Sequence, residues 1–333
     1  MRRDRLGVKH VKAVCGACIA AAVVGACGKI IYITAGSEAV GHGAGVNILL
    51  ETVILLLMSA ALSLELRCGG LDFSLGAVAV LSSSICAYIF SGSYVISVLL
   101  SVFFGAAAGL LSGAVRVISR LSCALCSLCM CLIFEGLAFI ARGGNKTYFA
   151  IGEVGYADAL RLLSVGVMLT VILYIAVRKT AWGAGYRAMS KNRETAELCG
   201  VDMRLCEIIT HIISGGLMGG AGALLCIREG RLIEAGLSFS SVRILFFGLL
   251  PLLWGRLYSY LTGDAVGDLL GVICSAGLYC MLRTVTRGIG GVGTENMTAI
   301  ASGVLLLIFL AFLSNRRSFF GKIRTTCGRL KKN

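Results

Sequence analysis

The stretch that decides the fold runs from Val46 to Val78 and reads VNILLETVILLLMSAALSLELRCGGLDFSLGAV. Its part from Val46 to Leu66 is almost continuously apolar, and ~20 such residues are enough to cross a membrane as a helix. The pair Gly69-Gly70 then breaks the helix, and a second apolar run begins at Leu71. Because the hydrophobicity is continuous instead of alternating, the pattern predicts helices and not the strands of a barrel.

The remainder of the chain repeats this alternation of long apolar runs and short polar breaks. Of the 333 residues of the whole chain, 57% are hydrophobic and only 14% are charged, against about 25% charged in typical soluble domains. This composition excludes a soluble enzyme, a disordered tail and a nucleic-acid-binding domain. The predicted fold class is all-α, a polytopic integral membrane protein of about ten transmembrane helices. The expected spans are Ala13–Ile33, Val46–Leu66, Leu71–Phe90, Tyr94–Ala114, Leu121–Ala141, Leu160–Val177, Ile208–Ile227, Arg243–Leu257, Ala265–Leu282 and Met297–Ser314.

The net charge of +14 is explained by where the basic residues lie. Residues 1–12 and 315–333 are basic tails, and residues 178–207 form a charged loop inside the predicted membrane domain, 13–314. If the N-terminus is cytoplasmic and ten spans alternate, more than two thirds of the 31 Lys and Arg residues fall inside. We therefore expect both termini in the cytoplasm, contact with membrane lipid, and no nucleic-acid partner. We also expect the first span to be an uncleaved helix and not a signal peptide.

Many of the 44 glycines are spaced four residues apart, which keeps small residues on one helical face and lets helices approach closely. This spacing predicts helix packing at Gly105, Gly109 and Gly113, at Gly215 and Gly219 (interleaved with Gly216 and Gly220), and at Gly263, Gly267 and Gly271.

The sequence carries no pattern typical of a catalytic or metal site. No Gly-x-x-x-x-Gly-Lys-Ser/Thr loop occurs, so the chain is not expected to hydrolyse ATP by that route. Side chains of the tightest cysteine cluster, Cys123 to Cys131, would fan around more than half of a helix and could not converge on one ion. His10, His42 and His211 are scattered along the chain. We therefore expect no catalytic residues and no metal, and neither disulfides nor a cofactor in this chain.

Two segments stand out from the apolar background. In the first, Asp72 follows the Gly-Gly break at the start of a helix, where the helix dipole stabilises a carboxylate, and Ser74 can satisfy free backbone N–H groups. In the second, Asn192 predicts an N-cap, Glu194 lies in the first turn, and Gly200 suits the position after the helix. The first segment is also compatible with an ordinary cap on a tight turn between spans, and the second with a solvated loop helix. The second is also compatible with a docking helix whose apolar patch is Ala196, Leu198 and Cys199.

The residues from Cys68 to Val78 resemble the Gly-Gly-Ile-Asp-Leu-Ser-Val-Gly signature of permease subunits of ribose-type sugar importers of the ATP-binding-cassette (ABC) class. The charged loop is similar to that family's cytoplasmic loop, with Trp182-Gly183, Asn192, Thr195-Ala196 and Cys199-Gly200-Val201 in corresponding places. The segments Ile213–Gly222 and Ala107–Gly144 follow the family's order, and the resemblance extends over about residues 46–314. The chain departs from the family at Glu135, where a basic residue is usual, and around Pro251, where paired glycines are usual.

This resemblance implies a permease fold and a function: a translocation pathway for a sugar or sugar-like solute in the inner membrane of a prokaryote. It implies three protein partners, namely an ABC ATPase subunit that binds the ATP and Mg²⁺, a second permease subunit, and an extracytoplasmic substrate-binding protein. The implied permease signature is Gly69, Gly70, Asp72, Ser74 and Gly76. The implied ATPase-coupling residues in the 178–207 loop are Asn192, Arg193, Glu194, Thr195, Ala196, Glu197 and Gly200.

Buried acids motivate an alternative of another class. Glu51 and Glu65 fall in the second predicted span and Glu135 in the fifth, and an ionised acid at the bilayer centre costs ~2.5–3.5 kcal/mol or more. Such acids are expected to be protonated or paired with residues such as Arg116 or Arg142. A proton-coupled secondary transporter with Glu135 as the carrier therefore stays open, as does a membrane protein that does not transport.

Overall fold

The structure is a computed structural model of the whole chain, and it describes residues 42–68, 70–89, 94–119, 121–143, 154–230, 232, 241–246, 248–249 and 251–252. Within these ranges every regular element is a helix and none is a strand. The helices are α2 (His42–Cys68), α3 (Ser74–Ile89), α4 (Tyr94–Ser119), α5 (Cys123–Ala141), α6 (Tyr156–Lys179), α7 (Ala181–Met189), α8 (Arg193–Leu198) and α9 (Met203–Glu229).

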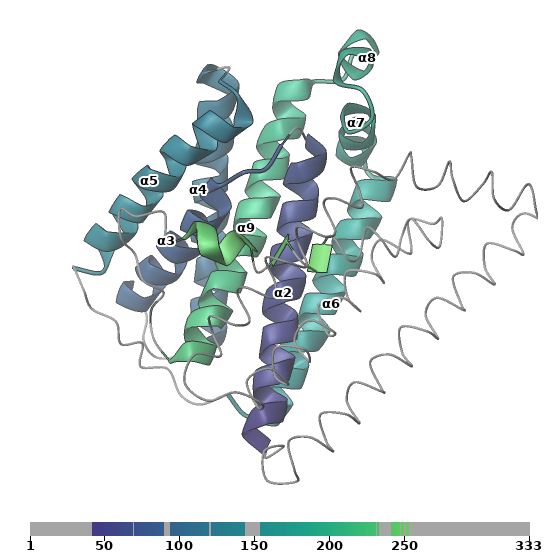
Figure 1. Cartoon of the computed structure of the whole chain (residues 1–333). Coiled ribbons are helices and arrows are strands. Elements are labelled where there is room, and N and C mark those ends of the chain that lie inside the picture. The colour runs from purple at the N-terminus through teal and green to yellow at the C-terminus, as the bar shows by residue number, and fades with distance from the viewer. Residues whose placement is uncertain are drawn as a thin grey trace, which may run out of the picture. The chain divides into compact units, whose positions relative to one another are not determined.

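Five of these helices, α2, α4, α5, α6 and α9, are long and apolar enough to cross a membrane, and α3 is a shorter apolar helix. They lie side by side (Figure 1), which confirms the predicted all-helical membrane fold. The described part of Arg243–Leu257 is helical at residues 243–246, 248–249 and 251–252. The predicted spans Ala13–Ile33, Ala265–Leu282 and Met297–Ser314, both tails, and Gly69, Gly263, Gly267 and Gly271 lie outside the described residues.

Several helix boundaries differ from the predicted ones, because hydropathy does not detect the polar caps. The third predicted span begins at Ser74 instead of Leu71, since the Asp72 side chain accepts the Ser74 N–H and so starts the helix. The seventh begins at Met203 instead of Ile208, because Asp202 accepts the N–H of Leu205. The helices observed for the second, fourth and sixth predicted spans, α2, α4 and α6, are also longer than expected, because they extend into polar residues at their ends.

The closest packing observed brings α4 and α9 together through their glycines. A Cβ placed on Gly105 would lie 2.4 Å from the Gly215 carbonyl oxygen, and one on Gly109 would lie 2.0 Å from that of His211. A Cβ on Gly219 would lie 2.2 Å from the Ser101 carbonyl oxygen. The four-residue spacing therefore lets the two backbones touch where any side chain would separate them.

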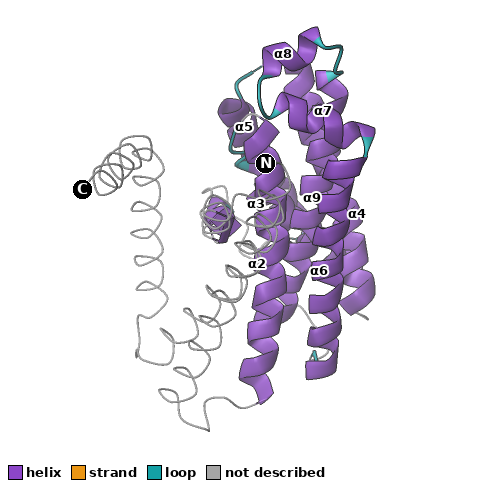
Figure 2. Ribbon diagram, turned by 90° about the vertical axis from the view of Figure 1, so that its right-hand side faces the viewer, coloured by secondary structure: helices purple, strands orange, loops and turns teal. Residues whose placement is uncertain are grey.

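The charged loop between the long helices α6 and α9 folds into two short helices, α7 and α8, which we call the hairpin. The hairpin lies at one end of the long helices in both views, and α8 is its outermost part (Figures 1 and 2). The sequence predicted α8 but missed α7, which begins where the Thr180 side chain accepts the Gly183 N–H at 3.0 Å.

Candidate functional site

The second helix of the hairpin, α8, has the caps that the sequence predicted. The Asn192 side chain accepts the N–H of Thr195 at 3.1 Å, and Gly200 follows the helix with a φ of +80°. A positive φ is strained for residues other than glycine, which explains the glycine there. The predicted local structure of this segment is thus confirmed, and its role in docking stays a prediction.

The exposed apolar surface of α8 contains fewer residues than the predicted patch of Ala196, Leu198 and Cys199. Leu198 is 89% exposed and Cys199 is also exposed, whereas Ala196 is only 2% exposed. Ala196 was expected to face a partner, but it packs inside the hairpin. Arg193, Glu194, Thr195, Glu197 and Gly200 are exposed, so α8 presents one large apolar side chain surrounded by polar groups.

Side-chain contacts tie the hairpin to the long helices. Tyr186 is buried, and its ring stacks on that of Trp182. Its hydroxyl donates to the Leu64 carbonyl near the end of α2, at 3.1 Å. Arg193 of α8 forms an ion pair with Glu207 in the first turns of α9. These two contacts attach the hairpin to α2 and α9, and Arg187 of α7 also donates to the Val177 carbonyl of α6.

The segment from Gly70 to Gly76 forms the turn into α3. Asp72 Oδ1 accepts both the backbone N–H of Ser74, at 2.8 Å, and its hydroxyl, at 2.6 Å. Gly70 has a φ of +154°, and a Cβ on Gly76 would lie 2.1 Å from the Ser241 carbonyl oxygen. Each polar residue of the segment therefore shapes the turn, and Gly76 admits a neighbouring backbone.

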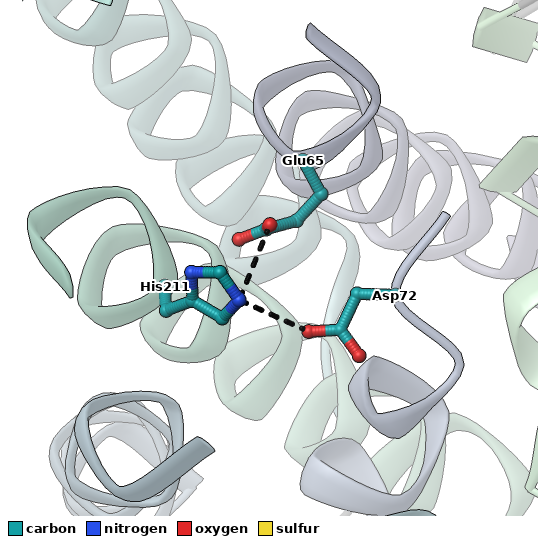
Figure 3. Close-up of side chains that lie close together, drawn as sticks. All are labelled: Glu65, Asp72 and His211. Atoms are coloured by element: carbon teal, nitrogen blue, oxygen red, sulfur yellow. Dashed lines mark ion pairs between the residues drawn. The ribbon is translucent and has the colours of Figure 1, made fainter. Parts of the chain in front are cut away.

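Asp72 also belongs to a buried polar cluster with Glu65 and His211 (Figure 3). His211 Nε2 lies 3.6 Å from Glu65 Oε2 and 3.7 Å from Asp72 Oδ2, and each of the three residues is at most 2% exposed. Glu65 comes from α2, Asp72 from the turn before α3, and His211 from α9. The spacing of the histidines did not predict this group, because the partners of His211 are two carboxylates and not other histidines. No local spacing brings Glu65 and His211 together.

The other buried acids have polar partners. Glu135 Oε1 accepts the backbone N–H of Ser241 at 2.9 Å and also its hydroxyl. Glu51 lies 3.4 Å from Arg228 of α9, a partner that the sequence analysis did not name. Arg116 lies 4.0 Å from Glu65, and Arg142 donates to the Ser84 hydroxyl at 3.1 Å. Burial of these charges within the described helices is thus accompanied by hydrogen bonds or ion pairs, as expected in a membrane interior.

The long apolar helices, the close glycine packing and the capped hairpin define the class, a multi-pass helical membrane protein. The chain belongs to the family described as the permease component of the branched-chain amino acid transport system, whose model matches residues 45–313.

Comparison with known proteins agrees with the predicted resemblance to ABC importer permeases. The chain is 24% identical to the ribose import permease protein RbsC of Bacillus subtilis (strain 168), over 82% of this chain and 84% of that protein. It is 26% identical to the fructose import permease protein FrcC of Rhizobium meliloti, over 79% of this chain and 76% of that protein.

Among solved structures, the fold matches a chain of an ABC transporter described as metal-chelate type, in an inward-facing conformation. The TM-score is 0.53 at 15% identity, over 88% of this chain and 99% of the other. The likeness concerns the fold, and it supports the predicted permease fold.

Proposed function

We propose that this chain is the permease subunit of an ABC importer and forms the translocation pathway for a sugar or sugar-like solute. The observation that carries this proposal is the similarity to ribose and fructose import permeases over about four fifths of the chain. In this proposal ATP and Mg²⁺ bind to a separate ATPase subunit. A second permease subunit completes the pathway, and an extracytoplasmic binding protein delivers the solute. The complex lies in the inner membrane of a prokaryote.

The hairpin is the proposed coupling element, with the hairpin and both termini on the cytoplasmic side. Its one large exposed apolar side chain, Leu198, suits a contact with a soluble partner, since the centre of such contacts is usually apolar. A displacement of the hairpin would pull on α2 through Tyr186 and on α9 through Arg193. Closure of the ATPase pair could then be passed on as rigid-body movement of those helices.

The docking role is tested with Leu198→Ser, which removes the exposed apolar contact and leaves the caps of α8 intact. Burial of a leucine side chain contributes about 1.5–3 kcal/mol, so the affinity for the ATPase should fall roughly 10- to 150-fold. The matched control is Leu160→Ser, an exposed leucine in the first turns of α6, far from the hairpin end of that helix. Co-purification of the ATPase with both variants at the native ratio would contradict the docking role.

The proton-coupled alternative makes a different demand on Glu135. The family match does not favour it, and the Glu135 carboxylate is held by two donors of Ser241. Glu135→Gln keeps an oxygen acceptor but cannot carry a proton. Under the ABC proposal, ATP-dependent solute uptake by this variant should persist and should survive collapse of the proton gradient. Loss of uptake with the ATPase still bound would favour the alternative.

A further inference from the structure

Three potential metal ligands point at one another inside the described helices. His211 Nε2, Glu65 Oε2 and Asp72 Oδ2 all lie within 4.8 Å of one another, and Figure 3 shows the three side chains converging from separate elements. A tetrahedral ion with bonds of about 2.0–2.1 Å separates its ligand atoms by about 3.3–3.4 Å. The separations of 3.6 and 3.7 Å from His211 Nε2 are close to that value, and the two carboxylates, which lie within 4.8 Å of each other, need a movement of their side chains to reach it.

The other polar atom of each ligand is already held in place. His211 Nδ1 lies 2.9 Å from the Glu207 carbonyl oxygen, and because a carbonyl only accepts, Nδ1 is the donor there, which leaves Nε2 as the ring nitrogen that faces the two carboxylates and is the ligand atom when the imidazole is neutral. Asp72 Oδ1 accepts two hydrogen bonds from Ser74, and Glu65 Oε1 accepts the Ser214 hydroxyl. Metal-binding histidines and carboxylates are typically oriented by such hydrogen bonds from surrounding residues.

The cluster also carries negative charge that its neighbours compensate poorly. Glu65 Oε2 is fully buried, and no hydrogen-bond donor among the described residues reaches it. The Arg116 guanidinium lies 3.4 Å from His211 Nε2 but 4.0 Å from Glu65 Oε2, so when the imidazole is neutral a single cation faces the two carboxylates. A buried carboxylate oxygen without a donor is costly, and it is aimed at the centre of the group.

We propose that Glu65, Asp72 and His211 bind a divalent transition-metal ion. One imidazole and two carboxylates suit Zn²⁺, Co²⁺ or Mn²⁺ better than Mg²⁺ or Ca²⁺, which prefer oxygen alone. Arg116 occupies the counterion position in this structure and withdraws when the ion enters. Because the ligands come from α2, the turn before α3, and α9, the bound ion ties together the helices next to the hairpin.

The test uses the purified full-length chain in lipid nanodiscs, with Co²⁺ and Zn²⁺ as probes. Equilibrium dialysis with elemental analysis should give one tightly bound equivalent, and Co²⁺ should give visible absorption bands of nitrogen and oxygen coordination. Glu65→Gln, Asp72→Asn and His211→Gln should each abolish that equivalent. Ser214→Ala removes only an orienting hydrogen bond and should weaken binding about 10- to 100-fold.

Two further variants guard against adventitious binding and misfolding. Glu51→Gln removes another buried acid of α2 and should leave the bound equivalent unchanged. Arg116→Gln removes the competing cation and should raise the affinity about tenfold or more. Gel-filtration profiles identify variants that fail to fold. The proposal is overturned if the native chain binds no stoichiometric ion, or if Co²⁺ shows a thiolate charge-transfer band. It is equally overturned if the ligand variants bind like the native chain, or if Arg116→Gln binds no more tightly.

Discussion

Two neighbouring glycines of α9 allow a direct test of the α4–α9 contact, because both lie near α4 but only one of them leaves no room for a Cβ. A Cβ on Gly215 would lie 2.4 Å from the Gly105 carbonyl oxygen. A Cβ on Gly216 would meet its nearest neighbour, the Val102 carbonyl oxygen, at 3.5 Å, which is ordinary contact. Gly215→Ala should therefore force α4 and α9 apart, whereas Gly216→Ala should be accommodated.

The magnitude follows from these distances. Restoring ordinary contact at Gly215 requires a separation of about 1 Å, and overpacking of this kind typically costs 1–3 kcal/mol. Both substitutions share the same gain in helix propensity, about 1 kcal/mol for alanine over glycine, so that term cancels when the two variants are compared. The free energy of unfolding of Gly215→Ala should thus lie about 1–3 kcal/mol below that of Gly216→Ala.

Thermal or denaturant unfolding of the two purified variants, followed by circular dichroism in the same detergent, measures this difference. The native chain and Gly105→Ala serve as references, because Gly105 faces Gly215 across the contact and should behave like it. Equal stability of Gly215→Ala and Gly216→Ala would refute backbone contact between α4 and α9. A greater loss at Gly216 would mean that Gly216, and not Gly215, makes the closest contact with the α4 backbone.

Two smaller perturbations test the attachment and capping of the hairpin. Asp202→Ala removes the acceptor for the N–H of Leu205 and should cost about 0.5–2 kcal/mol of stability in a chemical unfolding curve. Asp202→Asn, which retains an acceptor, should cost far less, and equal losses would contradict the capping role. Tyr186→Phe removes the hydroxyl that donates to Leu64. It should cost about 0.5–1.5 kcal/mol and speed hydrogen exchange within the hairpin, and unchanged exchange would show that this bond does not hold the hairpin.

The sequence predicted those features of the fold that depend on local pattern. Continuous apolar runs located the long helices, and the Asn192 and Gly200 caps located α8. Helix α7 was missed because it lies in the 178–207 segment, which its charges marked as a loop. Its glycines serve close packing, since a Cβ on Gly183 would lie 2.3 Å from the Val177 carbonyl oxygen.

The buried cluster could not be predicted, because its members are distant in the chain. Asp72 was recognised from its position after the Gly-Gly pair, but its partners Glu65 and His211 reach it only through the packing of α2 against α9. Ala196 was assigned to the exposed patch because composition alone does not tell which face of a six-residue helix is covered. Patterns along the chain therefore predict elements, whereas contacts between elements need the packed structure.

The most direct test of the proposed function asks on which side of the membrane the hairpin lies. Cys199 is exposed on the hairpin and Cys206 is buried in α9, so an impermeant maleimide, mapped by mass spectrometry, can report on one and use the other as an internal control. We predict labelling of Cys199 in inside-out membrane vesicles and none in right-side-out vesicles, with Cys206 unlabelled in both. Labelling of Cys199 in right-side-out vesicles would place the hairpin outside, where no ATPase could reach it, and would contradict the proposed function.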